Sequence, residues 1–265
     1  MVKDIPGLIT RVTREIHDFT DIAIIGLSGG ADSTLVALLC KLALGEKNVY
    51  GVHLPAAEID VNTFNKQSRA FARYISIHSV PITINPILTE FQVCLDLAIP
   101  SSENTQDMQK LLGNVRARLR MAMLYAVCER LAIEYPGKRG RVIGTGNLSE
   151  NYIGYCTKFG DSGVDIEVIG SLFKSEVYQL LDYFKDQGML LEEHINRIPS
   201  AGLFIGQTDE KDLGYTYAEM ELAIQKLKNT DPENEVERFV MVKHRENLHK
   251  IEAVRILPLR IFCED

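Results

Sequence analysis

Residues 21–34 read DIAIIGLSGGADST, an apolar run followed, within Gly26–Ser33, by three glycines, two serines and one aspartate. The apolar run predicts a short buried strand, and the residues from Ser33 onward predict a helix. A strand that passes through a glycine-rich turn into a helix leaves backbone N–H groups and the positive helix end facing an anion. The stretch therefore predicts a phosphate-binding loop at the end of a strand.

The residue types distinguish between the known loops of this kind. A Walker A loop needs a lysine before its Ser/Thr, whereas Asp32 precedes Ser33 here. The dinucleotide fingerprint needs G-x-G-x-x-G, and this stretch gives G-x-x-G-G. The remaining pattern, S-G-G-x-D-S, resembles the signature of the ATP pyrophosphatases, which split ATP between its α- and β-phosphates. That resemblance implies that ATP contacts Gly26, Leu27, Ser28, Gly29, Gly30, Ala31, Asp32 and Ser33. The structural alternative is a tight turn in which Ser33 caps the next helix.

Strand-like runs alternate with helical patterns along the first half of the chain. This order predicts an α/β fold with a doubly wound parallel sheet and flanking helices. Two helical stretches within about residues 215–250 are expected to dock on the same unit, so that 1–265 form a single domain. The expected strands are 22–28, 49–54, 80–87 and 141–147, and the expected helices begin at Ser33, Asn62 and Asn114.

The helix after Asn114 has an apolar stripe at helical spacing that includes Met121 and Cys128, which are expected to be core residues. Arg118 lies on a different flank of this helix from Arg116 and Arg120. Two polar segments without periodicity, 100–109 and 198–214, are expected to be loops.

Composition limits the function classes. The 265 residues have a formal net charge of −7 and a pI near 5.5, which disfavours a nucleic-acid partner held by phosphate contacts. No signal-peptide pattern and no run of eighteen apolar residues occurs, so we expect a cytoplasmic protein without a membrane partner. The five cysteines form no C-x-x-C pair, which favours reduced thiols over a zinc site.

A second cluster of polar residues begins at the end of the apolar part, RVI, of the strand-like run 141–147. It reads GTGNLSENYIGYCTKFGDSGVD, residues 144–165, and it lies at the same sheet edge as the phosphate loop. This stretch resembles the central motif of the NAD synthetase family, whose members amidate nicotinic acid adenine dinucleotide. Further matches occur in order along the chain, at 113–121, 173–178, 199–217 and 247–250.

The resemblance implies roles for individual residues. Thr145 would serve ATP, Lys174 the ATP phosphates, and Ser200 a phosphate or the nucleotide side of the metal site. Asp32 and Glu150 would be ligands of a Mg²⁺ ion that accompanies ATP, the co-substrate. The residues implied to contact deamido-NAD are Arg118, Lys158, Asp165, His249 and Lys250. As isolated residues, Thr145 and Ser149 could instead be helix caps, and Lys158 and Asp165 a surface ion pair.

The implied chemistry is adenylation followed by amidation. A carboxylate oxygen attacks the α-phosphate of ATP and releases pyrophosphate, after which ammonia attacks the acyl-adenylate and releases AMP. Lys174 and Lys158 would assist, and Asp165 is the expected acceptor of the ammonia proton. Because 265 residues leave no room for a glutaminase domain beside this fold, free ammonia is the expected donor. A separate glutaminase partner remains an open alternative.

The resemblance also implies a homodimer with the substrate at its interface. Three positions depart from the family pattern. Gly202 stands where an acidic residue is usual, His53 where many relatives have arginine, and the glutamine expected near adenine is Gln67 only if one residue is inserted. Two other functions remain open: another ATP pyrophosphatase, such as a GMP synthetase core or a tRNA-thiolating enzyme, and a non-catalytic nucleotide-binding module.

Overall fold

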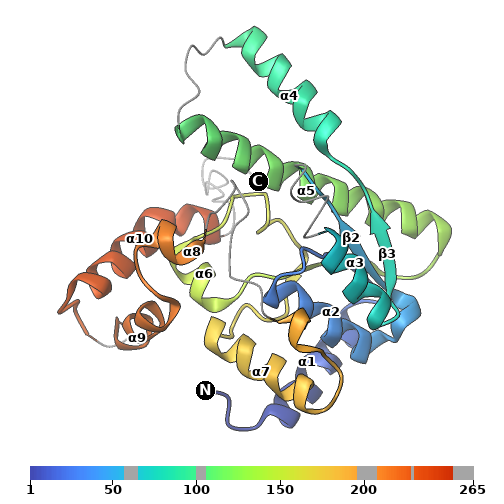
Figure 1. Ribbon diagram of the computed structural model, residues 1–265, viewed down its shortest axis with the longest axis horizontal. Helices are drawn as coiled ribbons and strands as arrows, with labels where there is room; N and C mark the ends of the chain where they lie inside the picture. Colours follow the sequence, from blue (N-terminus) through green and yellow to red (C-terminus); the bar gives the residue numbers. More distant parts are fainter. Residues whose placement is uncertain (57–64, 100–105, 196–207, 228–229, 253–265) are drawn as a thin grey trace, which may run out of the picture.

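The structure is a computed structural model that describes residues 1–56, 65–99, 106–195, 208–227 and 230–252. The described strands form one parallel sheet in the order β3-β2-β1-β4-β5, so the predicted doubly wound α/β fold is confirmed (Figure 1). The strands are β1 (Ile22–Gly26), β2 (Val49–His53), β3 (His78–Pro81), β4 (Gly140–Gly144) and β5 (Ile166–Glu167).

The helices flank this sheet and extend beyond it. They are α1 (Ile5–Phe19), α2 (Ala31–Leu44), α3 (Asn65–Tyr74), α4 (Asn85–Ala98), α5 (Gln106–Glu134), α6 (Leu148–Ile153), α7 (Lys174–Asp186), α8 (Asp209–Leu213), α9 (Tyr217–Leu227) and α10 (Glu235–Ile251). Short 3₁₀ helices cover Glu46–Asn48 and Glu192–His194. Among the residues that the structure describes, no helix has both the length and the apolar character needed to cross a membrane.

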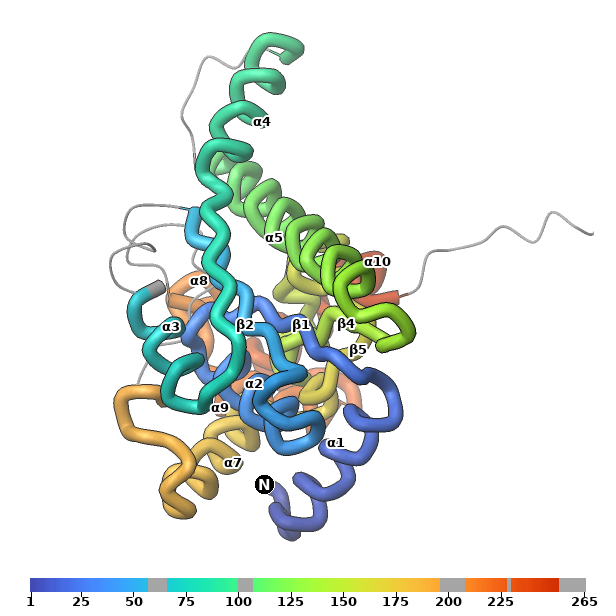
Figure 2. Tube along the Cα trace, turned by 90° about the vertical axis from the view of Figure 1, so that its right-hand side faces the viewer, coloured from blue at the N-terminus to red at the C-terminus, as the bar shows by residue number. Residues whose placement is uncertain are grey.

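The central strand β1 is buried on both faces, as expected for a parallel sheet covered by helices. Ala23 and Ile25 join the core cluster that includes residues of α1, α2 and α7. Ile22 and Ile24 point the other way and pack with the cluster that includes Leu124 of α5. In Figure 2, α5 lies across one face of the sheet, and α1, α2 and α7 lie on the other.

The pairing of β1 with β4 decides where the functional residues meet. Ile25 pairs with Ile143 in parallel register, so the two strands end at the same edge of the sheet. The loop that follows β1 and the segment that follows β4 therefore begin side by side. The sequence analysis places its candidate binding residues in these two stretches.

One predicted strand was wrong over most of its length. The run 80–87 was expected to be extended, but β3 ends at Pro81 and α4 begins at Asn85. Pro86 occupies the first turn of α4, where its missing N–H costs nothing and its fixed φ favours the helix. A short apolar run does not by itself distinguish a strand from a helix start.

The helices predicted from Ser33, Asn62 and Asn114 correspond to α2, α3 and α5, with differences at their ends. Helix α5 begins at Gln106 rather than Asn114, so the last residues of the expected loop at 100–109 are helical. Helix α8 occupies part of the expected loop at 198–214, and residues 198–207 lie outside the described residues.

The C-terminal helices α9 and α10 formed where the sequence predicted them. They share a third apolar cluster with α6 and the start of α7, which contains Ile153, Phe173, Met220, Ile224 and Val240. The contacts of these helices are thus made with α6 and α7. Whether the chain folds as one cooperative domain stays a prediction.

Two leucines of α2 provide a test of this packing. Leu39 is fully buried, whereas Leu42 is 40% exposed on the same helix. We expect Leu39→Ala to lower the free energy of unfolding by about 2–5 kcal/mol, because it removes buried surface and leaves a cavity. Leu42→Ala should change it by less than about 0.5 kcal/mol. Urea denaturation of both variants measures the difference, and equal losses would contradict the described burial.

Candidate active site

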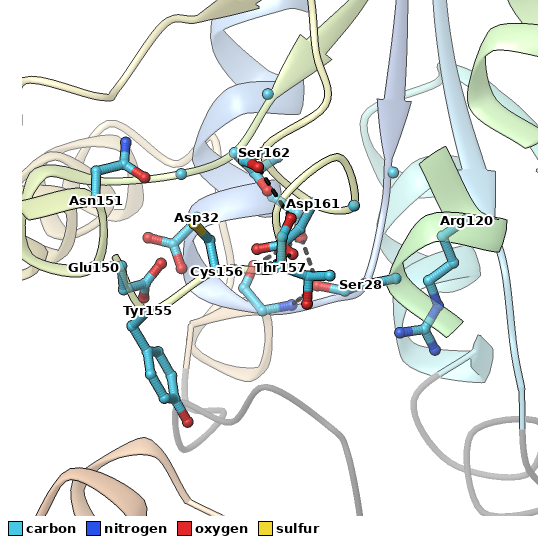
Figure 3. A pocket seen from close by; sticks show the side chains of 18 of the residues that line it. Ser28, Asp32, Arg120, Glu150, Asn151, Tyr155, Cys156, Thr157, Asp161 and Ser162 are labelled. Atoms are coloured by element: carbon cyan, nitrogen blue, oxygen red, sulfur yellow. Dashed lines mark hydrogen bonds between the residues drawn. The ribbon is translucent and has the colours of Figure 1, made fainter. Parts of the chain in front are cut away.

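The carboxyl edge of the sheet borders a cavity of about 880 Å³. Its wall comes from the ends of β1, β2 and β4 and from helices that include α2, α5, α6, α7, α8 and α10. In Figure 3, Asp32 and Glu150 lie on one side of this cavity, and Arg120 of α5 lies on the other. The cavity thus joins the two stretches that the sequence singled out.

The glycines of the phosphate loop are required by its shape. Gly29 has φ +80°, a left-handed conformation that side chains rarely adopt. A Cβ at this position would also lie 3.3 Å from the Cβ of Ser68 on α3. Any larger residue would therefore strain the turn and press it against α3.

The N-terminus of α2 presents backbone N–H groups at the cavity. Its N-cap is Gly30, and no side chain caps the helix. Ser33 lies inside the first turn, where its Oγ donates to the Gly30 carbonyl at 3.1 Å. The alternative that Ser33 caps α2 is therefore wrong, and the positive helix end remains open to an anion.

Lys174 connects the two sides of the phosphate site. Its ammonium lies 2.5 Å from Asp32 Oδ2 and 3.2 Å from Glu150 Oε1, and its side chain is only 4% exposed. Asp32 also accepts a hydrogen bond from Asn147 Nδ2 at 3.0 Å. Residues that follow β1, that follow β4 and that begin α7 thus converge on one point.

The charges in this group shift one another's pKa values. Burial would lower the pKa of Lys174, but Glu150 and Asp32 outweigh that effect and raise it, so the lysine stays charged. Burial raises the pKa of Glu150, Lys174 opposes that rise, and the nearby Asp32 carboxylate adds to it. The group needs a cation between its carboxylates, and Lys174 supplies one.

The residues present fit a Mg²⁺ ion shared with a nucleotide. Asp32 and Glu150 lie close enough to share one ammonium group, and hence one metal ion. Within the described part of the chain, no group of three or more His, Cys, Asp or Glu residues is arranged to hold a metal. Two carboxylates suit magnesium, which binds a few protein oxygens and completes its shell with phosphate and water.

The other predicted site residues divide into two groups. Thr145 and Lys250 line the cavity with the phosphate loop, and Lys250 Nζ donates to the Gly154 carbonyl at 3.0 Å. Arg118, Lys158 and His249 are not among the lining residues. Arg118 Nε instead donates to the Lys158 carbonyl at 3.2 Å, and His249 Nδ1 lies 3.1 Å from the Glu246 carbonyl. Ser200 and Gly202 lie outside the described residues.

Asp165 does not line the cavity in this conformation. Its carboxylate accepts hydrogen bonds from the Val142 N–H at 2.7 Å and from the Tyr125 hydroxyl at 3.2 Å. Val142 lies in β4 and Tyr125 in α5, and these contacts hold the carboxylate apart from the residues that line the cavity. Its predicted catalytic role stays a prediction.

Four other carboxylates line the cavity, and sequence reasoning did not assign them: Asp161, Glu167, Asp209 and Asp212. Asp161, which is exposed, accepts from the Thr157 N–H at 2.8 Å, and desolvation by the surrounding protein raises its pKa. Glu167 accepts from the Gly146 N–H at 2.7 Å, and burial raises its pKa to about 7. Asp161 belongs to the quoted motif, which was the available signal. Glu167 lies two residues beyond it.

Asn147 and Arg120 were also missed as individual site residues. Asn147 is fully buried, caps α6 and orients Asp32. Arg120 lines the cavity, and its Nε donates to the Leu54 carbonyl at 3.1 Å. The helical stripe could not show this, because Met121 beside it, expected in the core, also lines the cavity.

The structure describes two of the three positions that depart from the family pattern, His53 and Gln67. His53 is buried and lies between Ser68 Oγ at 2.8 Å and Ser79 Oγ at 2.9 Å. Burial lowers its pKa to about 4, so it is a neutral structural residue beneath the loop. Gln67 is exposed and does not line the cavity, whereas its neighbour Ser68 does.

Comparisons with known proteins show the family of this chain. The family profile described as NAD synthase matches residues 3–255. The chain belongs to the NAD synthase family. An NH(3)-dependent NAD(+) synthetase from Methanosarcina mazei is 37% identical over 211 residues, which cover 79% of this chain and 76% of that protein.

Two solved structures extend the comparison. The NMN synthetase from Francisella tularensis is 27% identical, with a TM-score of 0.79 over 97% of this chain and 100% of that one. The NH3-dependent NAD synthetase from Campylobacter jejuni, in complex with the nitrate ion, is 26% identical, with a TM-score of 0.70 over 96% and 99% of the two chains. As a member of the NAD synthase family, the chain is a ligase that forms a C–N bond. The other ATP pyrophosphatases and a non-catalytic module are not favoured.

The burial of Glu167 predicts a pH-dependent stability. Because its folded pKa of about 7 exceeds its ordinary value of 4.5, the folded state favours the protonated form. The resulting stability is complete below about pH 4.5 and is lost as the pH rises to about 7. Glu167→Gln resembles the protonated form at every pH. The Tm of the variant minus the Tm of the unmutated protein should therefore increase by roughly 3–10 °C from pH 4.5 to pH 8. Thermal unfolding across pH measures this, and exposed Glu15→Gln should show no such trend.

Proposed function

We propose that this chain amidates nicotinic acid adenine dinucleotide to NAD with ATP and ammonia, releasing AMP and pyrophosphate. The observation that carries the proposal is the convergence of Lys174, Asp32 and Glu150 beside the open helix end of α2, in a member of the NAD synthase family. A site of this kind holds the triphosphate of ATP and the charge that develops on its leaving group.

ATP would lie with its phosphates on the loop Ser28–Ser33. The open N–H groups at the start of α2 and the ammonium of Lys174 would contact phosphate oxygens. Asp32 and Glu150 would hold Mg²⁺, which when bound neutralises phosphate charge. Those two carboxylates would then no longer require Lys174 as their only cation, leaving its ammonium available to the pyrophosphate.

The reaction balances in two steps. An oxygen of the substrate carboxylate attacks the α-phosphorus, the bond from that phosphorus to the bridging oxygen breaks, and pyrophosphate leaves. Ammonia then attacks the acyl carbon, and AMP leaves with the bonding electrons. The nitrogen must lose a proton in this second step, and we propose a carboxylate on the cavity wall as its acceptor.

Asp161 is the proposed acceptor in the conformation described. It is exposed to the cavity, whereas Asp165 would have to leave the Val142 N–H and Tyr125 to reach it. Lys158 precedes Asp161 by three residues, and Arg118 contacts the Lys158 backbone. We propose that both side chains reach the dinucleotide near the rim of the cavity. Lys250 is already on the cavity wall, and His249 and Ser200 keep their proposed substrate and phosphate roles.

A second acceptor follows from the likeness to the NMN synthetase of Francisella tularensis. Nicotinic acid mononucleotide has the same reacting carboxylate as the dinucleotide and lacks only the adenylate half. The purified protein is therefore tested with each acceptor, with ATP and Mg²⁺, and with ammonium, glutamine or neither. We expect NAD and AMP in equal amounts with the dinucleotide and ammonium. Faster turnover of the mononucleotide would make this chain an NMN synthetase, and no amide product from either would contradict the proposal.

Lys174 provides a mutational test. Lys174→Met should lower kcat for NAD formation by about 10²–10³-fold, because the ammonium that offsets the pyrophosphate charge is lost. Lys185→Met is the matched control, since Lys185 lies on the same helix, is partly exposed and pairs with Asp182. Rates of AMP release measure both variants. A Lys174 variant as active as the Lys185 variant would remove Lys174 from the mechanism.

A homodimer is proposed through α4 and the adjoining end of α5. No residue of α4 is fully buried, and its exposed apolar side chains include Ile87, Phe91, Val93 and Leu97. Figures 1 and 2 show α4 standing away from the sheet, in contact with one end of α5. An exposed apolar surface of this kind is typical of an interface. A second copy of this chain, as the family resemblance implies, would cover it.

Sedimentation tests the dimer. Phe91→Asp should shift the protein from dimer to monomer at micromolar concentration, because a charge at the centre of the interface would be desolvated. Ile133→Asp, at the opposite end of α5 and 71% exposed, should leave the dimer intact. A monomeric unmutated protein, or equal behaviour of the two variants, would contradict this interface.

A further inference from the structure

Helix α9 holds a buried carboxylate that the proposed mechanism does not use. Glu221 is 5% exposed, and no described lysine or arginine forms an ion pair with it. Its Oε1 accepts from Ser149 Oγ at 2.8 Å and from the Ser175 N–H at 3.1 Å, and its Oε2 accepts from Ser175 Oγ at 2.5 Å. A buried charge is stable only when it is well hydrogen-bonded, and these three donors meet that need.

The donors flank the two residues that matter most at the phosphate site. Ser149 precedes Glu150 in α6, and Ser175 follows Lys174 in α7. Ser149 also accepts from the Lys174 N–H at 3.0 Å. Because the single hydroxyl hydrogen of Ser149 is given to Glu221, this chain of hydrogen bonds has a fixed direction from Lys174 to Glu221. Glu221 therefore fixes the backbone next to both Glu150 and Lys174.

The same contacts give α7 a different role from α2. The first N–H groups of α7 are bonded to Ser149 and Glu221, and the Phe173 N–H is bonded to Glu176. Helix starts attract negative groups, and here the protein supplies its own. The N–H groups of residues 173–175 are therefore occupied, whereas those at the start of α2 are open to a phosphate. Helix α7 contributes to the site through the Lys174 side chain instead.

A second residue on the same face of α9 reaches the site directly. Tyr217 lies one helical turn before Glu221, so the two side chains share a face. The Tyr217 hydroxyl lies 2.9 Å from Glu150 Oε1 and 2.9 Å from Asp209 Oδ2. One helix thus holds Glu150 through Tyr217 and holds the backbone of Lys174 through Glu221.

We propose that Glu221 is a positioning residue of the ATP site, which sets the mutual placement of Lys174 and Glu150 through Ser149 and Ser175. The proposal rests on the proposed function for the identity of the nucleotide. It makes α9, which packs against α6, α7 and α10, part of the machinery that binds ATP. Partners of this type typically change ligand affinity or activity by about 10–100-fold when removed.

The test compares two buried carboxylates of the C-terminal helices, Glu221 in α9 and Glu237 in α10. Glu221→Leu removes all three acceptor contacts, whereas Glu221→Gln keeps an oxygen acceptor and the shape of the side chain. Glu237→Leu is the matched control, because Glu237 is 2% exposed and accepts from the Glu233 N–H and Asn234 Nδ2 at the start of α10. The readouts are ATP affinity with Mg²⁺ by calorimetry, KM for ATP and for ammonium, kcat and Tm.

For Glu221→Leu we expect ATP affinity and kcat/KM for ATP to fall by about 10–100-fold, with KM for ammonium unchanged. Glu221→Gln should restore most of the affinity, and Glu237→Leu should lower Tm without changing ATP affinity. ATP affinity in Glu221→Leu within twofold of that in Glu237→Leu would overturn the proposal. If Glu221→Leu does not fold, Ser175→Ala removes the hydroxyl contact to Glu221 Oε2 and keeps the backbone N–H contact to Oε1. This variant should weaken ATP binding in the same direction by a smaller factor, and unchanged affinity would overturn the proposal.

Calorimetry needs no acceptor substrate, so the two proposals fail separately. Unmutated protein that binds ATP but makes no amide would contradict the proposed function alone. Unmutated protein that makes NAD, with a Glu221→Leu variant of normal ATP affinity and kcat/KM, would contradict the positioning role alone.

Discussion

The ion pairs of Lys174 with Asp32 and Glu150 are the interaction on which the site depends. The two carboxylates follow different strands, and bringing them together in a partly buried place requires a positive charge between them. Lys174 supplies that charge from the first residue of a third segment, α7. Parallel pairing of β1 and β4 makes the approach possible, because both strands end at one edge.

The start of a helix is used in two opposite ways around this group. Gly30 leaves the first turn of α2 without a side-chain cap, so its N–H groups remain open at the cavity. Ser149 and Glu221 close the first turn of α7, so its N–H groups only fix the position of Lys174. The same backbone property therefore provides an anion site in one helix and rigidity in the other.

The C-terminal helices gain a role from this arrangement that packing alone would not suggest. Their apolar cluster joins α9 and α10 to α6 and Phe173, which immediately precedes Lys174. Polar contacts from Tyr217 and Glu221 then reach Glu150 and Ser149 at the proposed ATP site. An apolar contact sets the distance between the helices, and the directional hydrogen bonds set the orientation of the charged groups.

The sequence by itself determined the parallel sheet and the glycine turn between β1 and α2, because apolar runs and glycines are local patterns. The common site of Asp32, Glu150 and Lys174 was predicted from the family resemblance, and the structure brings these three side chains into contact. The sequence did not determine the helical start at Asn85, the placement of Arg120 on the cavity wall, or the contacts of Glu221. A short apolar run is compatible with either a strand or the start of a helix. The direction in which Arg120 or Glu221 points depends on partners more than 40 residues away in the chain, and only tertiary packing brings those partners into contact.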